Sequence, residues 1–428
     1  CIVSRGLVMA ARERIEKRCQ IPGANVMIVA SHTHSGGPLF GFLTADFSDA
    51  PKEVRKLAVD ESVVIDPVYQ EWAIAQIATA VAQADHQKAD VKLSFDSGRA
   101  CGVAFNRRFK MKNGRVYTHP GKGNPDIVAP AGPVDDEVAV LGIWNDQRLL
   151  GCIVNFACHA TVSPGGISAD WIYYLEQTIR GVFGGDVVVL FQSGAAGDVT
   201  QVDNQTRRED EFGEYWARVV GGTVGAEAVR LLSTARAREE NALAATSTLL
   251  KIPRRLPSAK RLAHAKKVVA NPPKESAANE WAAGAAATEF VMSKELLVLD
   301  YIASRQPVVD VEIQALQVGA SLWIANPSEF FAELGLRIKR ESPFPRTQVV
   351  TLANGGVGYV PTSDAFEPQG GGYETVLTSY SNLVTSAGDT IASESVRLAR
   401  QFKSPPERAT QFPLGNPWAY GVLGPELD

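Results

Sequence analysis

The sequence predicts an α/β fold: a mixed sheet layered with helices, an active site in loops at strand ends, and a helical insertion. Up to about residue 205, runs of β-branched and apolar residues end repeatedly in short polar loops. Stretches with apolar residues at helical spacing separate these runs, and this alternation is typical of α/β proteins whose chemistry lies at strand ends. Residues 232–305 are instead rich in Ala, Lys, Arg and Glu, which indicates inserted surface helices.

The expected elements follow one another along the chain. A strand end runs into an amphipathic helix within residues 1–19. Further helices are expected, in order, over residues 69–84, 206–231, 254–270, 275–303, 326–340 and 389–402. Strands are expected over residues 25–30, 149–158, 186–191, 311–318 and 321–325. Because no internal repeat or low-complexity linker divides the sequence, we expect one domain over residues 1–428, with 232–305 as its helical insertion.

Composition and charge argue against two classes of protein. Of the 428 residues, 45% are hydrophobic and 21% are charged, which are ordinary values for a globular chain with a sizeable core. The formal net charge of −4 argues against a general nucleic-acid binder, whose surface is usually basic. No apolar run approaches the ~18 residues that a transmembrane helix needs.

The predicted insertion carries a basic stripe with two interpretations. Its members are Arg254, Arg255, Lys260, Arg261, Lys266 and Lys267. A basic helix can contact acidic lipid. A charge run is more often a solvated helix face, and we favour that interpretation.

The cysteines and the N-terminus give two further expectations. Five cysteines are present, and none forms a CxxC pair: Cys1, Cys19, Cys101, Cys152 and Cys158. We therefore expect most of them to be small buried side chains, and neither a disulfide framework nor a zinc cluster. The first residues include no initiator Met and no signal peptide, so we expect a processed or truncated N-terminus.

Three of the six histidines follow predicted strands. His32 and His34 form an HxH pair after the strand 25–30, and His159 ends the strand 149–158. In an extended backbone, residues i and i+2 face the same side, so both side chains of the pair can point at one atom. A catalytic zinc ion needs about three protein ligands and an open position. The alternative, in which the pair is two ordinary polar residues at a strand end, stays open.

A carboxylate that could complete such a site lies in the segment Asn326-Pro327-Ser328-Glu329. The pattern favours a capping box, with Asn326 as N-cap, Pro327 at the first helical position and Glu329 three residues after the cap. On residue chemistry alone, we favour capping over metal ligation for Glu329.

The stretch FQSGAAGDVTQVDN, residues 191–204, has the appearance of a catalytic turn. It carries Asp198 and Thr200 after a run of β-branched residues. The sequence has no GxSxG elbow and no HExxH helix. The turn also lacks the spacing of the dinucleotide fingerprint and of the P-loop. A metal centre beside a turn of small residues is therefore the remaining interpretation.

Six separated segments together resemble the neutral/alkaline (non-lysosomal) ceramidase family, which are zinc-dependent amidases of N-acylsphingosine. In chain order they read SHTHSGGP, FNRR, NFACHATV, SGAAGDVT, NPSEFFAELGLRIK and GYVPTSDAFEPQGGGYE. The resemblance covers nearly the whole chain. It implies a hydrolase with a small-molecule or lipid-like substrate and a secreted or periplasmic location, and it leaves a homo-oligomer open.

The resemblance also implies a ligand set for Zn²⁺. The first histidine of the HTHSG motif is His32, and the histidine closing N-F-x-x-H is His159. The family's P-G-E-F glutamate corresponds to Glu329, and the tyrosine of its Y-[IV]-T-T motif corresponds to Tyr359. The resemblance therefore favours ligation by Glu329, against the capping interpretation.

The catalytic positions follow in the same way. The second histidine of HTHSG is His34, a candidate proton shuttle, and the arginine of the N-R motif is Arg107, near the reacting group. Asp198 is expected to orient His34 or a ligand. Thr200 stands where the family's GDVSPN turn has its serine, because this chain reads GDVTQV. Thr200 is therefore expected at most to position water or substrate.

The sequence thus predicts a zinc-dependent hydrolase that cleaves an N-acyl, ceramide-like amide bond. We also expect that this protein lacks the C-terminal immunoglobulin-like domain that family members often carry. The first alternative is a hydrolase of a glycosidic or ester bond on the same metal frame, which could use Asp198, Asp203, Glu367 and Glu374 as paired carboxylates. The second is a non-enzymatic binding protein with a degenerate site.

Overall fold

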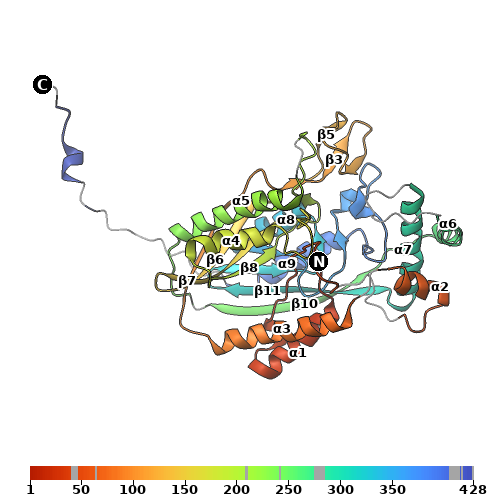
Figure 1. Cartoon of the computed structure of the whole chain (residues 1–428), viewed down its shortest axis with the longest axis horizontal. Helices are drawn as coiled ribbons and strands as arrows, with labels where there is room; N and C mark the ends of the chain where they lie inside the picture. Colours follow the sequence, from red (N-terminus) through yellow and green to blue (C-terminus); the bar gives the residue numbers. More distant parts are fainter. Residues whose placement is uncertain are drawn as a thin grey trace.

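The central feature of the structure is a pair of four-stranded sheets (Figure 1). The computed structural model describes residues 1–39, 47–62, 65–207, 211–240, 242–273, 285–403, 415 and 418–426. The first sheet has the order β1-β6-β7-β8: Lys92–Arg99, Glu137–Asn145, Arg148–Phe156 and Val188–Ser193. The second has the order β10-β11-β12-β14: Leu243–Pro253, Val308–Val318, Ser321–Ala325 and Arg346–Val350. Each sheet is mixed, because β7–β8 and β12–β14 are parallel and the other pairs antiparallel.

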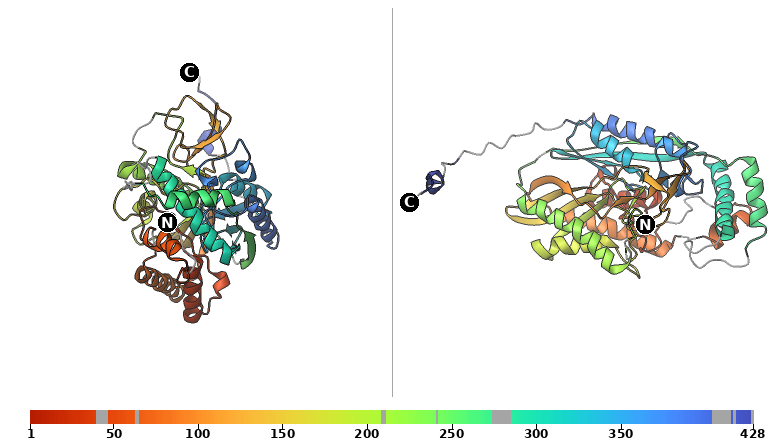
Figure 2. Two further views of the ribbon diagram at one scale, coloured as in Figure 1. Left: turned by 90° about the vertical axis from the view of Figure 1, so that its right-hand side faces the viewer. Right: turned by 90° about the horizontal axis from the view of Figure 1, so that it is seen from above.

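The two sheets pack face to face between two layers of helices. Leu141 and Ile153 of the first sheet share an apolar cluster with Trp323 and Val350 of the second. The outer face of the first sheet is covered by α4, Trp171–Phe183, and α5, Gly213–Thr234. That of the second is covered by α8, Ala332–Glu341, and α9, Ala387–Ala399. In the right-hand view of Figure 2, the blue and the yellow-green helices lie on opposite sides of the strands. The predicted α/β class with mixed sheets is confirmed.

Smaller elements surround this sandwich. Helices α1, Arg5–Cys19, and α3, Pro67–His86, pack against each other beside the sheets. At one end of the molecule, α7, Ala285–Arg305, packs with α6, Ala259–Val269, and near α2, Lys52–Arg55 (Figure 1). No helix among the described residues combines the length and the apolar character that crossing a bilayer requires.

Short strands outside the two large sheets lie near the strand ends, where the active-site loops are expected. A small antiparallel sheet, here called the finger, projects from the sandwich: β3, β4 and β5, which are Arg108–Met111, Val116–Thr118 and Ile127–Pro130 (Figure 1). Two further pairs join distant segments. β2, Phe105–Asn106, pairs with β9, Val199–Thr200, and β13, Glu329–Phe330, pairs with β15, Tyr359–Val360.

Several predicted elements differ from the structure. Residues 25–30 form no regular strand, and Val29 makes only an isolated bridge to Ala353. No strand precedes α1, and α5 begins at Gly213 rather than at 206. Within the predicted insertion, residues 243–253 form β10, a strand of the second sheet, so its described helices are only α6 and α7. Residues 275–284, the start of the second predicted helix there, lie outside the described residues.

Two predictions about side chains are also corrected. All five cysteines are free, but only Cys152 and Cys158 are buried, so the prediction that most are buried is wrong. The basic residues do not form one stripe. Arg254 and Arg255 precede α6 and are partly buried, Arg255 over the Phe366 ring. The basic residues within α6 are exposed, in agreement with a solvated helix face: Lys260, Arg261, Lys266 and Lys267.

Candidate metal centre

Three donor side chains from distant segments converge at one end of the sandwich. His159 follows β7, Glu329 lies in β13, and His32 lies in the loop after residues 25–30. Oε2 of Glu329 is 3.1 Å from Nε2 of His32 and 3.0 Å from Nε2 of His159. All three side chains are buried, and their donor atoms lie within 4.8 Å of one another. The predicted His32–His159–Glu329 group is therefore assembled by the fold.

The reason given for the HxH convergence is wrong, although the convergence itself occurs. His32 has a φ of 64°, in the left-handed region, so the pair is not extended. Nε2 of His34 nevertheless lies 3.4 Å from Nε2 of His32. Burial of the His34 ring, followed by the neighbouring His32 and His159, lowers the pKa of His34 to about 2. Of these three histidines, His34 is the one whose residue is exposed at the surface.

The hydrogen bonds of the two buried histidines define their tautomers. Nδ1 of His159 is 3.0 Å from the carbonyl oxygen of Val199, and Nδ1 of His32 is 3.1 Å from that of Cys1. A carbonyl oxygen only accepts, so in a neutral ring Nδ1 carries the proton and Nε2 presents a lone pair. Burial and the charge of Arg107 lower the pKa of His159 to about 4, so this ring is neutral near neutral pH.

This arrangement fits a metal ion. When both rings are neutral, Nε2 of His32, Nε2 of His159 and Oε2 of Glu329 are all hydrogen-bond acceptors, and no proton lies between them. A cation placed between them removes the repulsion, and two imidazoles with one carboxylate form a familiar donor set for zinc. Backbone carbonyls on the opposite ring nitrogens are the usual means by which proteins orient metal-binding histidines.

The local structure around Glu329 explains why it is free to ligate. Helix α8 begins at Ala332, with Phe331 as its N-cap, so Glu329 lies in β13 and outside the helix. The predicted capping box is therefore wrong. The amide N–H of Ser328 is bonded to the Asn326 side chain. The Asn326 side chain therefore closes this local turn, and the Glu329 carboxylate takes no part in it.

The small-residue turn lies directly against this strand. The N–H of Gly197 donates to the carbonyl of Phe330 at 2.8 Å. A Cβ atom on Gly197 would lie 2.4 Å from the Glu329 carbonyl oxygen. A side chain at that position would therefore displace β13 and its carboxylate. This close approach explains the second glycine of the GAAGD segment, Gly197.

Two tyrosines flank Glu329. Tyr380 donates its hydroxyl to Oε1 of Glu329 at 2.6 Å, which leaves Oε2 for the histidines. Tyr359, predicted as a ligand, pairs with Glu329 across β13 and β15, and its ring stacks at 6.5 Å from that of His159. Burial and the Glu329 charge raise the pKa of Tyr359 well above its ordinary value. Sequence reasoning missed Tyr380, because no motif or spacing marks it.

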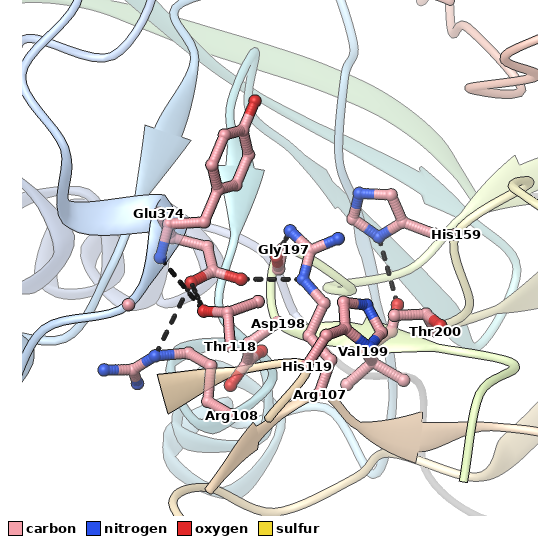
Figure 3. A network of polar contacts seen from close by, with 12 residues as sticks. Arg107, Arg108, Thr118, His119, His159, Gly197, Asp198, Val199, Thr200 and Glu374 are labelled. Atoms are coloured by element: carbon pink, nitrogen blue, oxygen red, sulfur yellow. Dashed lines mark hydrogen bonds and ion pairs between the residues drawn. The ribbon is translucent and has the colours of Figure 1, made fainter. Parts of the chain in front are cut away.

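Arg107 lies beside one of the two tyrosines that flank Glu329. Its guanidinium lies 5.4 Å from the centre of the Tyr359 ring. Its Nε donates to Oε1 of Glu374 at 2.6 Å, and another nitrogen donates to the carbonyl of Gly197 at 2.9 Å (Figure 3). Thr118 of the finger donates to the other oxygen of Glu374 at 2.8 Å. A buried polar network therefore fixes the guanidinium beside the metal centre.

Asp198 and Thr200 each accept hydrogen bonds that stabilise the local structure, and their predicted catalytic roles stay predictions. Asp198 accepts from the N–H of Ala332 at 2.9 Å and from the side chain of Asn106 at 2.8 Å, so it holds the start of α8. These bonds are not to His34. The Thr200 hydroxyl accepts from the N–H of Val202 at 3.0 Å, which is a local turn contact.

The burial of Asp198 gives a pH-dependent prediction. Burial raises its pKa from 3.8 to about 6. The folded protein then holds this proton more tightly than the unfolded chain, so the contribution of Asp198 to stability falls as the pH rises from about 4 to about 6. We expect the free energy of unfolding of the wild type, minus that of Asp198→Asn, to fall by up to about 3 kcal/mol over this range. Urea unfolding at several pH values measures the difference, and a constant difference contradicts the prediction.

The fold and the site together define the class: an α/β sandwich protein with a buried histidine–histidine–glutamate group suited to a metal ion. No family model matches the sequence, and no curated protein does. Solved structures do match. Neutral ceramidase from Pseudomonas aeruginosa is similar with a TM-score of 0.62 and 16% identity over 96% of this chain and 67% of that chain. A ceramidase complexed with C2 has a TM-score of 0.63 and 16% identity, covering 96% and 68%. The chain therefore has the neutral ceramidase fold, as the resemblance predicted.

Proposed function

We propose that the protein is a zinc-dependent hydrolase that cleaves the amide bond of an N-acyl, ceramide-like substrate. The observation that carries the proposal is the His32–His159–Glu329 group, whose two oriented rings face a carboxylate in a fold shared with ceramidases. A secreted or periplasmic location and a lipid-like substrate belong to the same proposal.

The side chains around this group have separable roles. When bound, zinc supplies a Lewis acid that lowers the pKa of a water from about 15.7 towards about 7. In this proposal, Arg107 and the protonated hydroxyl of Tyr359, which lie beside each other, donate to an oxyanion that develops on the substrate carbonyl. His34 is the proposed proton relay between the site and solvent, because its residue reaches the surface. Its lowered pKa means that the ring passes a proton on and does not retain it. Tyr380 keeps the Glu329 carboxylate in one orientation.

A glycosidase would need two free carboxylates, but most of the candidate carboxylates make other bonds in the structure. Asp198 holds α8, and Glu374 lies between two arginines, with Arg108 Nε at 3.7 Å in addition to Arg107. Asp203 accepts from the N–H of Gln205 in a local turn. Glu367 is exposed. An ester bond on the same metal frame stays the second candidate, because it needs the same groups as an amide.

A substrate screen tests the proposal. Purified protein is incubated with N-acyl amines, matched esters and matched glycosides, with and without a chelator, and fatty acid or sugar release is measured. We expect release of fatty acid from the amides, loss of that activity with the chelator and recovery on adding zinc. Cleavage of glycosides alone, or amide cleavage insensitive to a chelator that removes the metal, contradicts the proposal. A protein that binds zinc but hydrolyses none of these substrates supports the binding-protein alternative.

Replacement of Thr200 tests whether its hydroxyl takes part in the chemistry. Thr200→Ala removes the bond from the Val202 N–H, which costs about 1 kcal/mol of stability. We expect kcat to change by less than about tenfold, because a threonine without an adjacent base is a weak nucleophile. Thr200→Ser should restore the stability. A loss of kcat as large as that caused by removing a proposed metal ligand would show that the hydroxyl acts in catalysis.

A further inference from the structure

A pocket of about 580 Å³ lies between the finger and the loop of residues 365–375. Aromatic residues are among its lining on both sides: Tyr117 of β4, and Phe366 and Tyr373 of the loop. Tyr117 is 41% exposed and Tyr373 is 54% exposed. The Tyr117 hydroxyl accepts a bond from Asn113 at 2.8 Å, and Arg255 lies 4.5 Å from the centre of the Phe366 ring. The walls are therefore accessible and partly fixed before any ligand binds.

This pocket adjoins the metal centre through contacts on its inner side. The Tyr373 ring meets the Tyr359 ring edge-on, with centroids 5.5 Å apart. The Tyr373 N–H donates to the Thr118 hydroxyl at 3.0 Å, and Thr118 donates to Glu374, the partner of Arg107 (Figure 3). The residues that line the pocket thus belong to the network that holds the guanidinium. A group seated there would be attached to a substrate whose reacting bond lies at the metal centre.

The lining chemistry identifies the kind of group. Among the described residues that line the pocket, none is Leu, Ile or Met. Glu367 and Arg115 supply an acceptor and donors beside the aromatic faces, and Gly370, Gly371 and Gly372 leave backbone accessible. A long alkyl chain needs an apolar channel, which this lining does not provide. A hydroxylated ring can instead lay its C–H face on tyrosine and bond its hydroxyls to the charged groups.

We infer that this pocket is a specificity subsite for a hydroxylated ring of the sugar type, carried on the polar, non-acyl end of the substrate. The inference rests on the proposed function and narrows its substrate class to glycosylated N-acyl amines. The finger forms one wall, so its sequence determines this preference. The cleaved bond remains the amide, and the sugar is a recognition element.

The kinetic test uses two N-acyl sphingoid amines with the same acyl chain, one free and one carrying a single hexose on its primary hydroxyl. Fatty acid release is measured for the wild type, Tyr117→Ala and Tyr173→Ala, an exposed tyrosine of α4 outside the pocket. We expect the wild type to favour the hexosylated substrate by about two- to tenfold in kcat/KM, the effect of one good aromatic contact. Tyr117→Ala should lose that preference through KM, and Tyr173→Ala should keep it. A wild-type preference for the free amine, or an equal loss on both substrates, overturns the inference.

A binding measurement separates this inference from the proposed function. Methyl glucoside and the hexosylated amine are titrated into the wild type and Tyr117→Ala, and binding is followed by ligand-observed NMR. Saturable binding that Tyr117→Ala weakens supports the subsite even if neither amide is cleaved, in which case only the proposed function fails. Absence of saturable binding of both probes, or equal binding to the variant, overturns the subsite whatever the activity.

Discussion

Glu329→Gln is expected to reverse the effect of zinc on stability. In the variant, the amide oxygen can still accept from Tyr380, and the amide nitrogen places two N–H donors where Oε2 faces the histidines at 3.0 and 3.1 Å. Without metal, two hydrogen bonds therefore replace a cluster of acceptors, and we expect the variant to be about 1–3 kcal/mol more stable than the wild type. With zinc at about 1,000 times its dissociation constant, the wild type gains about 4 kcal/mol and the variant gains little.

Thermal unfolding, with a chelator and with zinc, measures the stability difference between the variant and the wild type under both conditions. Glu333→Gln is the control, because Glu333 is exposed on the neighbouring helix α8 and carries the same change of charge. It should follow the wild type under both conditions. If Glu329→Gln is destabilised without metal, or is stabilised by zinc as much as the wild type, the acceptor cluster is not a metal site.

Glu374→Ala is expected to have the largest effect on stability. Glu374 is fully buried and neutralises Arg107 at 2.6 Å, with Arg108 at 3.7 Å. Removing it leaves buried positive charge without a partner, which costs about 3–5 kcal/mol. Because the same carboxylate fixes the guanidinium beside Tyr359, we also expect kcat to fall. Urea unfolding measures the first effect, and fatty acid release from an N-acyl amine measures the second.

An exposed ion pair provides the comparison. Arg14 and Glu71 are also 2.6 Å apart, but their side chains are 34% and 62% exposed. Glu71→Ala should cost less than about 1 kcal/mol, because water screens this pair. Glu374→Gln keeps the shape and one acceptor, so it should retain more stability than Glu374→Ala. Equal, small costs for Glu71→Ala and Glu374→Ala would show that the network is not what fixes Arg107.

The sequence predicts the core of the fold where apolar patterns are long. Strands β7 and β8 and helices α3 and α9 are found within a few residues of their expected positions. Residues 25–30 were expected to form a strand because they are apolar, but their backbone polar groups bond irregularly, including Ala30 to Leu352. β10 was missed because it lies at the start of a segment whose composition is helical. Tertiary pairing with β11 determines its conformation over the full length of both strands.

The family resemblance identifies the residues of the candidate site better than local sequence patterns do. His32, His159 and Glu329 lie far apart in sequence, and only the packing of the two sheets brings their donor atoms together. The pattern around Glu329 suggested a helix cap, since Asn-Pro-Ser-Glu is a good capping sequence. The structure uses Asn326 in a turn instead. Tyr380 lies in no recognised segment, and Glu374 was named only as a possible paired carboxylate, because their roles depend on contacts 51 and 267 residues away in the chain.

Metal content tests the central claim most directly. The wild type, His32→Ala combined with His159→Ala, and the exposed control His264→Ala are purified under identical conditions, loaded with zinc and dialysed. Elemental analysis then gives the zinc bound per chain. We expect about one zinc ion per chain in the wild type and in the control. In the double variant, we expect the zinc affinity to fall by at least about 100-fold, because even outer partners of metal ligands contribute 10–100-fold. Full zinc occupancy in the double variant would contradict the central claim.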